Sequence, residues 1–177
     1  MTTDTQVQVT VRQYRPEDHA AVTKIFIQSF IAVEKNLKYR YRWEERLRED
    51  LTTDLADIQA SHMAPGGNFW VAVATTKGTS KVVGITGLMR VSDAVGEVRR
   101  VYVDQTCHRM GVGRKLMAQM ESWSRQNGIK SVFLTTNAKN ESSQAFYAAL
   151  GYTKADETLY AWENLKYFEV YKFVKQL

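Results

Sequence analysis

The chain has little cysteine, no long apolar run and no cluster of histidines. Its single cysteine excludes an internal disulfide framework and favours a reducing compartment. No stretch reaches the length of a membrane span, and the polar N-terminal residues lack the charged and apolar regions of a signal peptide. We therefore expect a cytoplasmic protein that does not bind a membrane.

The ionisable residues argue against a metal site and are compatible with a polyanionic cofactor. His19, His62 and His108 lie far apart, and none has a cysteine or a second histidine at the spacing of metal ligands. The sequence therefore predicts no metal site. The formal net charge of +5 suits a polyanionic cofactor, although a solvated basic surface explains it equally well.

The chain reads as one unit, without internal repeats or low-complexity linkers. With 177 residues, 44% of them hydrophobic, it is long enough for one well-buried domain and short for two. We predict a single domain over residues 1–177, with residues 1–6 as a disordered tail. Hydrophobic periodicity predicts helices that start after Arg15, at Trp43 and at Gly111 and Glu141, the second running to Ile58. Strands are predicted at 7–12, 69–75, 81–91, 95–104, 131–136, 153–162 and 166–175.

Residues 98–117 pass from a strand-like stretch, through a turn with Gly111 and Gly113, into an amphipathic helix. Such a turn lets backbone N–H groups converge on an anion, and the positive end of the helix adds to the attraction. Arg109 and Arg114 place positive charge on either side. Two glycines before a helix also suit a turn for purely steric reasons. There is no Gly-Lys-Ser/Thr ending and no third glycine at the dinucleotide spacing, which excludes both common phosphate loops.

The strand before this loop contains one irregularity. Its apolar residues are Val98, Val101 and Val103, so the period of two slips once between Val98 and Val101. A β-bulge has this effect, but a regular strand in which Arg99 or Arg100 reaches solvent also explains the pattern. The family resemblance described next implies the bulge.

Two segments together resemble the signatures of one family. His108-Arg109-Met110-Gly111-Val112-Gly113 resembles the Q/R-x-x-G-x-G/A signature of the GNAT superfamily, the acyl-coenzyme A-dependent N-acyltransferases. The run from Asn140 to Tyr152 resembles the second signature, in which Asn precedes a helix that carries Tyr and closes on Gly and an aromatic residue. The resemblance covers about residues 9 to 175 and departs from the usual pattern at His108 and Ser143.

The resemblance implies a fold and a cofactor. The expected α/β fold is a mixed, mostly antiparallel central sheet of about seven strands, with a V-shaped splay between the fourth and fifth strands and about four helices packed on it. Acetyl-CoA would enter that gap as co-substrate. The implied cofactor-binding residues are Val101, Tyr102, Val103, Arg109, Met110, Gly111, Val112, Gly113, Arg114 and Asn140.

Acyl transfer from a thioester to an amine needs a neutral amine, a polarised carbonyl and a protonated leaving thiolate. The resemblance points to Glu97 as a base acting through water and to Tyr147 as the acid. Glu97 can also be an exposed acid at a strand end, and Tyr147 an ordinary aromatic of the core. Cys107 lies in the loop, and the family transfers directly, so we expect no covalent role for it.

Residues 35–48 interleave basic and aromatic side chains, a pattern that can serve nucleic acid. Trp43 and Leu47 belong to an apolar stripe, and acidic residues dilute the charge, so we expect no nucleic-acid binding. The resemblance instead implies that Tyr39, Tyr41 and Trp43 touch the amine substrate.

The sequence as a whole predicts an N-acetyltransferase that moves an acetyl group directly to a primary amine of a small molecule or peptide. The acceptor, the length of the acyl chain and the oligomeric state stay open, with a homodimer as one candidate. A competing hypothesis is a catalytically silent acyl-CoA-binding module for regulation or assembly. That module needs the phosphate loop but neither Glu97 nor Tyr147.

Overall fold

The computed structural model describes residues 7–33, 40–163 and 166–177, and the predicted tail at residues 1–6 lies outside them. The strands form one seven-stranded sheet in the order β1-β2-β3-β4-β5-β7-β6. Only β4 and β5 run parallel among its neighbouring pairs in the described residues, which confirms the expected mixed, mostly antiparallel sheet. The strands are β1 (Gln8–Gln13), β2 (Asn68–Thr76), β3 (Thr79–Arg90), β4 (Val95–Val103), β5 (Ser131–Asn137), β6 (Thr153–Glu163) and β7 (Lys166–Gln176).

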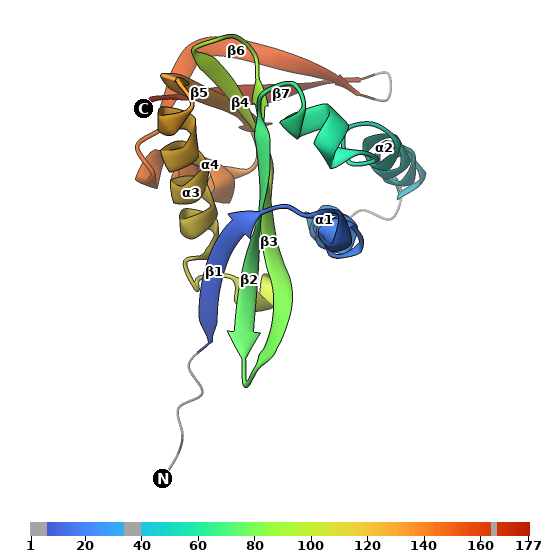
Figure 1. Ribbon diagram of the computed structural model, residues 1–177. Coiled ribbons are helices and arrows are strands. Elements are labelled where there is room, and N and C mark those ends of the chain that lie inside the picture. The colour runs from blue at the N-terminus through green and yellow to red at the C-terminus, as the bar shows by residue number, and fades with distance from the viewer. Residues whose placement is uncertain (1–6, 34–39, 164–165) are drawn as a thin grey trace.

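The helices cover both faces of the sheet (Figure 1). They are α1 (His19–Val33), α2 (Arg40–Thr52), α3 (Val112–Gln126) and α4 (Glu141–Ala149), with short turns η1 (Pro16–Asp18), η3 (Gln59–Met63) and η4 (Gln105–Cys107). α3 buries Leu116, Met117 and Met120 against one face. α1 buries Ile25 and Phe26 against the other. Each such side chain contributes roughly 1.5–3 kcal/mol by leaving water, so the two clusters hold the sheet from both sides.

The predicted bulge is present in β4. Gly87 on β3 faces Arg99, and Ile85 faces Tyr102, so two residues of β4 stand opposite one residue of β3. Arg100, the first of the two, has a φ of +58°, in the left-handed region. The extra residue turns Val98 and Val101 to the same face of the sheet, where both belong to or pack against the apolar cluster that contains Leu116 of α3.

The predicted splay lies between β4 and β5. Their pairing comprises Val95 with Ser131, Gly96 with Val132, and Glu97 with Phe133. Beyond that point β4 follows its bulge toward β3, while β5 continues to Asn137 alongside β7. A gap between the strands therefore opens just after Glu97.

The expected helix from Trp43 to Ile58 is shorter than predicted, because α2 ends at Thr52. The hydroxyl groups of Thr52 and Thr53 donate hydrogen bonds to the carbonyls of Arg48 and Glu49, and such local bonds compete with the continuing helix. Leu55 and Ile58 are nevertheless buried in the same apolar cluster as Ile25 and Phe26 of α1, which explains why their spacing looked helical. Among the described residues, no helix is long and apolar enough to cross a membrane.

Candidate active site

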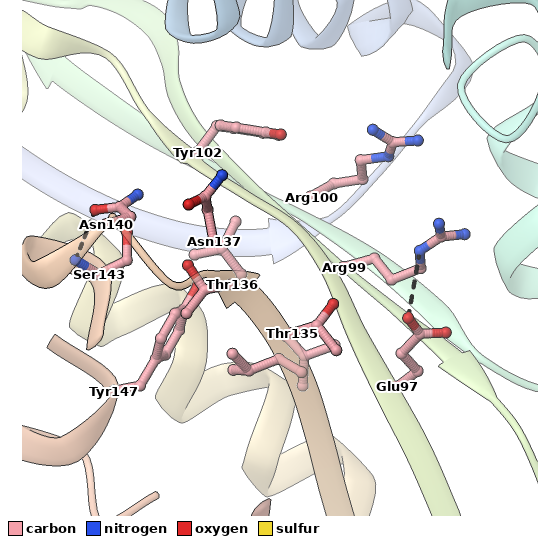
Figure 2. Close-up of a pocket in the computed structure, with 13 residues that line it drawn as sticks. Glu97, Arg99, Arg100, Tyr102, Thr135, Thr136, Asn137, Asn140, Ser143 and Tyr147 are labelled. Atoms are coloured by element: carbon pink, nitrogen blue, oxygen red, sulfur yellow. Dashed lines mark hydrogen bonds and ion pairs between the residues drawn. The ribbon is translucent and has the colours of Figure 1, made fainter. Parts of the chain in front are cut away.

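A pocket of about 330 Å³ lies where β4 and β5 separate. The two strands line opposite sides, and the start of α4 closes one end (Figure 2). The lining residues are Glu97, Val98, Arg99, Arg100, Val101, Tyr102, Leu134, Thr135, Thr136, Asn137, Asn140, Ser143 and Tyr147. The fold therefore brings together five of the predicted site residues, namely Glu97, Val101, Tyr102, Asn140 and Tyr147.

Tyr147 reaches the pocket from α4. Asn140 caps this helix, because its Oδ1 accepts a hydrogen bond from the backbone N of Ser143 at 3.1 Å. The Tyr147 ring packs edge-on against Phe146, with ring centroids 5.2 Å apart. Burial raises the pKa of the Tyr147 phenol well above its usual value, and the neighbouring Tyr102 raises it further. The phenol is therefore protonated at neutral pH and available as a donor.

Glu97 reaches the pocket from the last residue of β4 that pairs with β5. Its side chain is 30% exposed, and its Oε1 lies 3.7 Å from Nε of Arg99 (Figure 2). This ion pair is too long for a hydrogen bond, so the carboxylate retains access to water. A carboxylate in that position can accept a proton through solvent.

The loop between β4 and α3 is held in a defined shape. Asp104 accepts hydrogen bonds from the backbone N of Thr106 at 3.0 Å and from Nζ of Lys81 at 2.6 Å. The Lys81 ammonium and the Thr106 hydroxyl lower the pKa of Asp104 to about 2, so its carboxylate stays charged. Arg109 and Gly111 then adopt left-handed φ values of +63° and +75°. These two residues turn the chain sharply into α3.

The start of α3 fits a pyrophosphate group. Its first hydrogen bond runs from the backbone N of Lys115 to O of Gly111 at 3.0 Å, which leaves the N–H groups of Val112, Gly113 and Arg114 without helical acceptors. A Cβ atom at Gly111 would meet nothing within 4 Å, so the space in front of the loop is open. Free N–H groups and the helix dipole together favour an anion there.

Residues 20–152 match the Acetyltransferase (GNAT) family. The chain belongs to this family. Over 142 residues it is 28% identical to N-acetyltransferase 8 of Homo sapiens, a match that covers 76% of this chain and 61% of the relative. Over 144 residues it is 32% identical to N-acetylaspartate synthetase of Danio rerio, covering 77% of this chain and 50% of the relative. The chain thus matches 50 to 61% of the length of these two curated relatives.

Solved structures share the GNAT fold. The structure of yncA from Salmonella typhimurium with its cofactor acetyl-CoA has a TM-score of 0.67, at 19% sequence identity. The match covers 95% of this chain and 93% of that chain. The similarity covers nearly the whole chain and so confirms the fold expected from the two signatures.

The two glycines of the GNAT loop have different surroundings. Gly111 faces open space, whereas a Cβ at Gly113 would lie 3.1 Å from the ring of Phe146 and 3.8 Å from a methyl group of Val103. The sequence suggested that both glycines give room to a phosphate. The structure gives Gly113 a further role, because its lack of a side chain lets α3 pack closely against α4.

The side chains of the three predicted acceptor residues lie outside the part of the chain that the structure describes. Tyr39 lies outside the described residues, and the structure describes no side chains for Tyr41 and Trp43 on α2. Their role in this GNAT protein stays a prediction. Cys107 is half-buried and is not among the residues that line this pocket. That it takes no part in transfer stays a prediction.

Sequence reasoning missed a buried charge network beside the pocket. The Arg100 guanidinium donates to Oδ1 of Asp50 at 2.9 Å and to both carboxylate oxygens of Asp54, with Nε at 2.9 Å from Oδ2. The three side chains are only 8%, 7% and 10% exposed. Burial opposes ionisation of Asp54, but the hydrogen bonds and charge of Arg100 outweigh it and lower the pKa of that carboxyl. Arg100 and Asp54 therefore both stay charged in the interior.

His62 on η3 completes this network. Its Nε2 lies 3.7 Å from Oδ2 of Asp54, and its Nδ1 lies 2.9 Å from Oγ of Ser61. The ring is fully buried against Phe69, with centroids 5.2 Å apart. Burial lowers the pKa of His62 to about 4, although the Asp54 charge acts in the opposite direction. His62 is therefore neutral near pH 7.

Proposed function

We propose that the protein is an N-acetyltransferase that moves the acetyl group of acetyl-CoA directly to a primary amine of a small molecule or peptide. The observation that carries the proposal is that Glu97 and Tyr147 line one pocket, at the opening between β4 and β5. Membership of the GNAT family supports it, as do the N-acetyltransferase and synthetase names of the two relatives.

The cofactor would lie in the gap with its two ends held by backbone groups. The N–H groups at the start of α3 are suited to the pyrophosphate, with exposed Arg109 and Arg114 nearby. The bulge frees part of the β4 backbone around Val101 and Val103 from pairing with β5, and that backbone is suited to the pantetheine arm. The bound thioester would supply the activated acetyl group.

Two side chains would move the protons. Glu97 would take a proton from the incoming ammonium group through one or two waters, which leaves a neutral amine as the nucleophile. Tyr147 would donate its phenolic proton to the sulfur as the C–S bond breaks. Because burial raises the pKa of Tyr147, the phenol holds its proton at neutral pH and that proton is present when the C–S bond breaks.

The test is release of coenzyme A when the protein meets acetyl-CoA and an amine. Pools of amino acids, polyamines, aminoglycosides and lysine peptides would be screened with a thiol reagent, and reactions without amine would correct for hydrolysis and for Cys107. We expect amine-dependent release from at least one pool and an acetylated product of the corresponding mass. Binding of acetyl-CoA without transfer to any pool would favour the silent binding module instead.

A further inference from the structure

Glu97 and Arg99 lie side by side on one face of β4. Val98, between them, is buried in the apolar cluster that contains Leu116 of α3. Because strand residues alternate between faces, both charged side chains project from the other face. Figure 2 shows them together beside β4, whereas Tyr147 lies apart from them on α4. A guanidinium group therefore accompanies the expected base at the pocket.

The Arg99 guanidinium is only loosely held. Its Nε lies 3.7 Å from Oε1 of Glu97, beyond hydrogen-bond distance, and its Nη1 lies 3.3 Å from Sδ of Met89, which is a weak acceptor. Its Nη2 has no hydrogen bond or ion pair with any described residue. The side chain lines the pocket and stays 34% exposed, so it is accessible to a ligand there.

The neighbouring Arg100 is not accessible in the same way. Its guanidinium is bonded to Asp50 and Asp54, and all three side chains are at most 10% exposed. The charge of Arg99 also acts on Asp54 and on His62, but Asp54 is held by Arg100 and His62 is neutral near pH 7. Arg99 is thus the one partly exposed cation among the described residues that line the pocket.

The accessible charges of the pocket form one pair of opposite sign. Glu97 is the single acid among the described lining residues, and its side chain is 30% exposed. A free α-amino acid carries the matching pair, since its ammonium nitrogen and carboxylate oxygens lie roughly 3 Å apart through the shared Cα. The Arg99 Nε and the Glu97 Oε1 are separated by a similar 3.7 Å. The second ammonium group of a polyamine would instead meet a guanidinium.

We propose that the acceptor is a free α-amino acid, with Arg99 as the residue that binds its carboxylate while Glu97 faces its amino group. The inference rests on the proposed acetyl transfer and narrows it. A polyamine, a lysine side chain and a peptide N-terminus all lack a carboxylate on the carbon that bears the amine. Arg99 would therefore select among amines without moving a proton.

The transfer itself keeps the roles proposed above. The C–S bond of the thioester breaks as a C–N bond to the α-nitrogen forms. The ammonium group loses two protons, of which one passes through water to Glu97 and the other replaces the proton that Tyr147 gives to sulfur. The carboxylate stays ionised on Arg99 throughout.

Comparison of each α-amino acid with its own α-amide isolates the carboxylate. The amide keeps the side chain and the amine, and its amine is less basic, so a site indifferent to the carboxylate would use the amide at least as well. We expect kcat/KM to be at least about tenfold higher for the acid than for the amide of every amino acid that is acetylated. Spermidine and Nα-acetyl-lysinamide should be poor acceptors.

Arg99→Gln should lower this acid-to-amide ratio of kcat/KM by about 10- to 100-fold, the loss expected for a hydrogen bond to a charged group. The ratio is decisive because loss of Arg99 also alters the surroundings of Glu97, which affects both acceptors alike. Arg99→Lys should retain part of the preference, since an ammonium group keeps the charge but not the two-pronged geometry. Arg125→Gln removes the same charge from a 50% exposed side chain away from the pocket and should leave the ratio unchanged.

The outcomes separate this inference from the proposed function. Acetyl transfer with a ratio near one in wild type, or with a ratio that Arg99→Gln leaves unchanged, would overturn the role of Arg99 while the transferase stands. If wild type transfers acetyl to no amine, the proposed function fails. Calorimetry of the coenzyme A-bound protein with the same acids and amides then decides on Arg99. Tighter binding of the acid, lost in Arg99→Gln, is expected, and equal binding of acid and amide would overturn the carboxylate site.

Discussion

Phe146 on α4 lies 3.1 Å from the point that a Cβ atom at Gly113 on α3 would occupy. That separation is closer than normal carbon–carbon contact, so the ring fills the space of the missing side chain. The contact joins α3, which follows the phosphate loop, to α4, which carries Tyr147. This packing contact therefore links the geometry of the loop to that of the helix that carries the expected acid.

A methyl group at Gly113 should therefore destabilise the protein. We expect Gly113→Ala to lower the free energy of unfolding by about 1–3 kcal/mol, because the Phe146 ring must shift to admit the new Cβ. Thermal unfolding measures the loss. Phe146→Leu introduced into Gly113→Ala should recover part of it, and a double variant no more stable than Gly113→Ala would show that the ring is not the obstacle.

Gly111 provides the contrasting case, because the space around it is open. Gly111→Glu adds bulk and negative charge where the pyrophosphate is expected, so we predict near-total loss of acetyl-CoA binding in a folded protein. Gly111→Asn is the control, since asparagine tolerates the left-handed φ of +75° and carries no charge. Calorimetry that found unchanged affinity in Gly111→Glu would remove the phosphate loop from the proposed site.

Glu97→Gln tests the expected base. A base acting through water matters only while the amine arrives protonated, so the rate should fall most at neutral pH and less at alkaline pH, where free amine is abundant. Glutamine keeps the shape of the side chain while removing its charge. A pH–rate profile of kcat/KM is the measurement, and a uniform loss at every pH would point to a structural role for Glu97.

His62 should make stability depend on pH. The unfolded chain binds a proton at this residue below its ordinary pKa of 6.5, whereas the folded protein does so only below about 4. Proton uptake by the unfolded state therefore lowers stability as pH falls from 6.5 to 4, by about 3 kcal/mol at most. His62→Gln cannot titrate and should lack this part of the decline. Denaturant unfolding at pH 7, 5.5 and 4.5 measures both proteins.

The sequence predicted those features that produce a pattern among neighbouring residues. The slip between Val98 and Val101 predicted the bulge together with the family resemblance, because strand residues alternate between faces and an extra residue disturbs that alternation. The cap at Asn140 was visible for a similar reason, since a short polar side chain before a helix bonds its free N–H groups. The family signatures then supplied the mixed sheet and the splay between its fourth and fifth strands, which spacing alone does not contain.

Contacts between residues that are far apart in the sequence produce no such local pattern. Asp50 and Asp54 lie 50 and 46 positions from Arg100, in a segment where charges of both signs alternate, so nothing local marks them as its partners. The contact of Gly113 with Phe146 was hidden for the same reason. Leu55 continued a helical spacing although α2 had ended, because burial against one face does not require a continuous helix.

Tyr147→Phe is the most direct test of the proposed mechanism. The change removes only the phenolic hydroxyl and keeps the ring against Phe146, so acetyl-CoA affinity and Tm should barely move. If the phenol protonates the leaving thiolate, kcat should fall by roughly 100-fold or more. Because burial raises the pKa of Tyr147 above its ordinary value of 10.0, wild-type activity should show no loss from tyrosine ionisation as pH approaches 10. Near-normal turnover in Tyr147→Phe would instead assign proton delivery to water and leave the Tyr147 ring as part of the core.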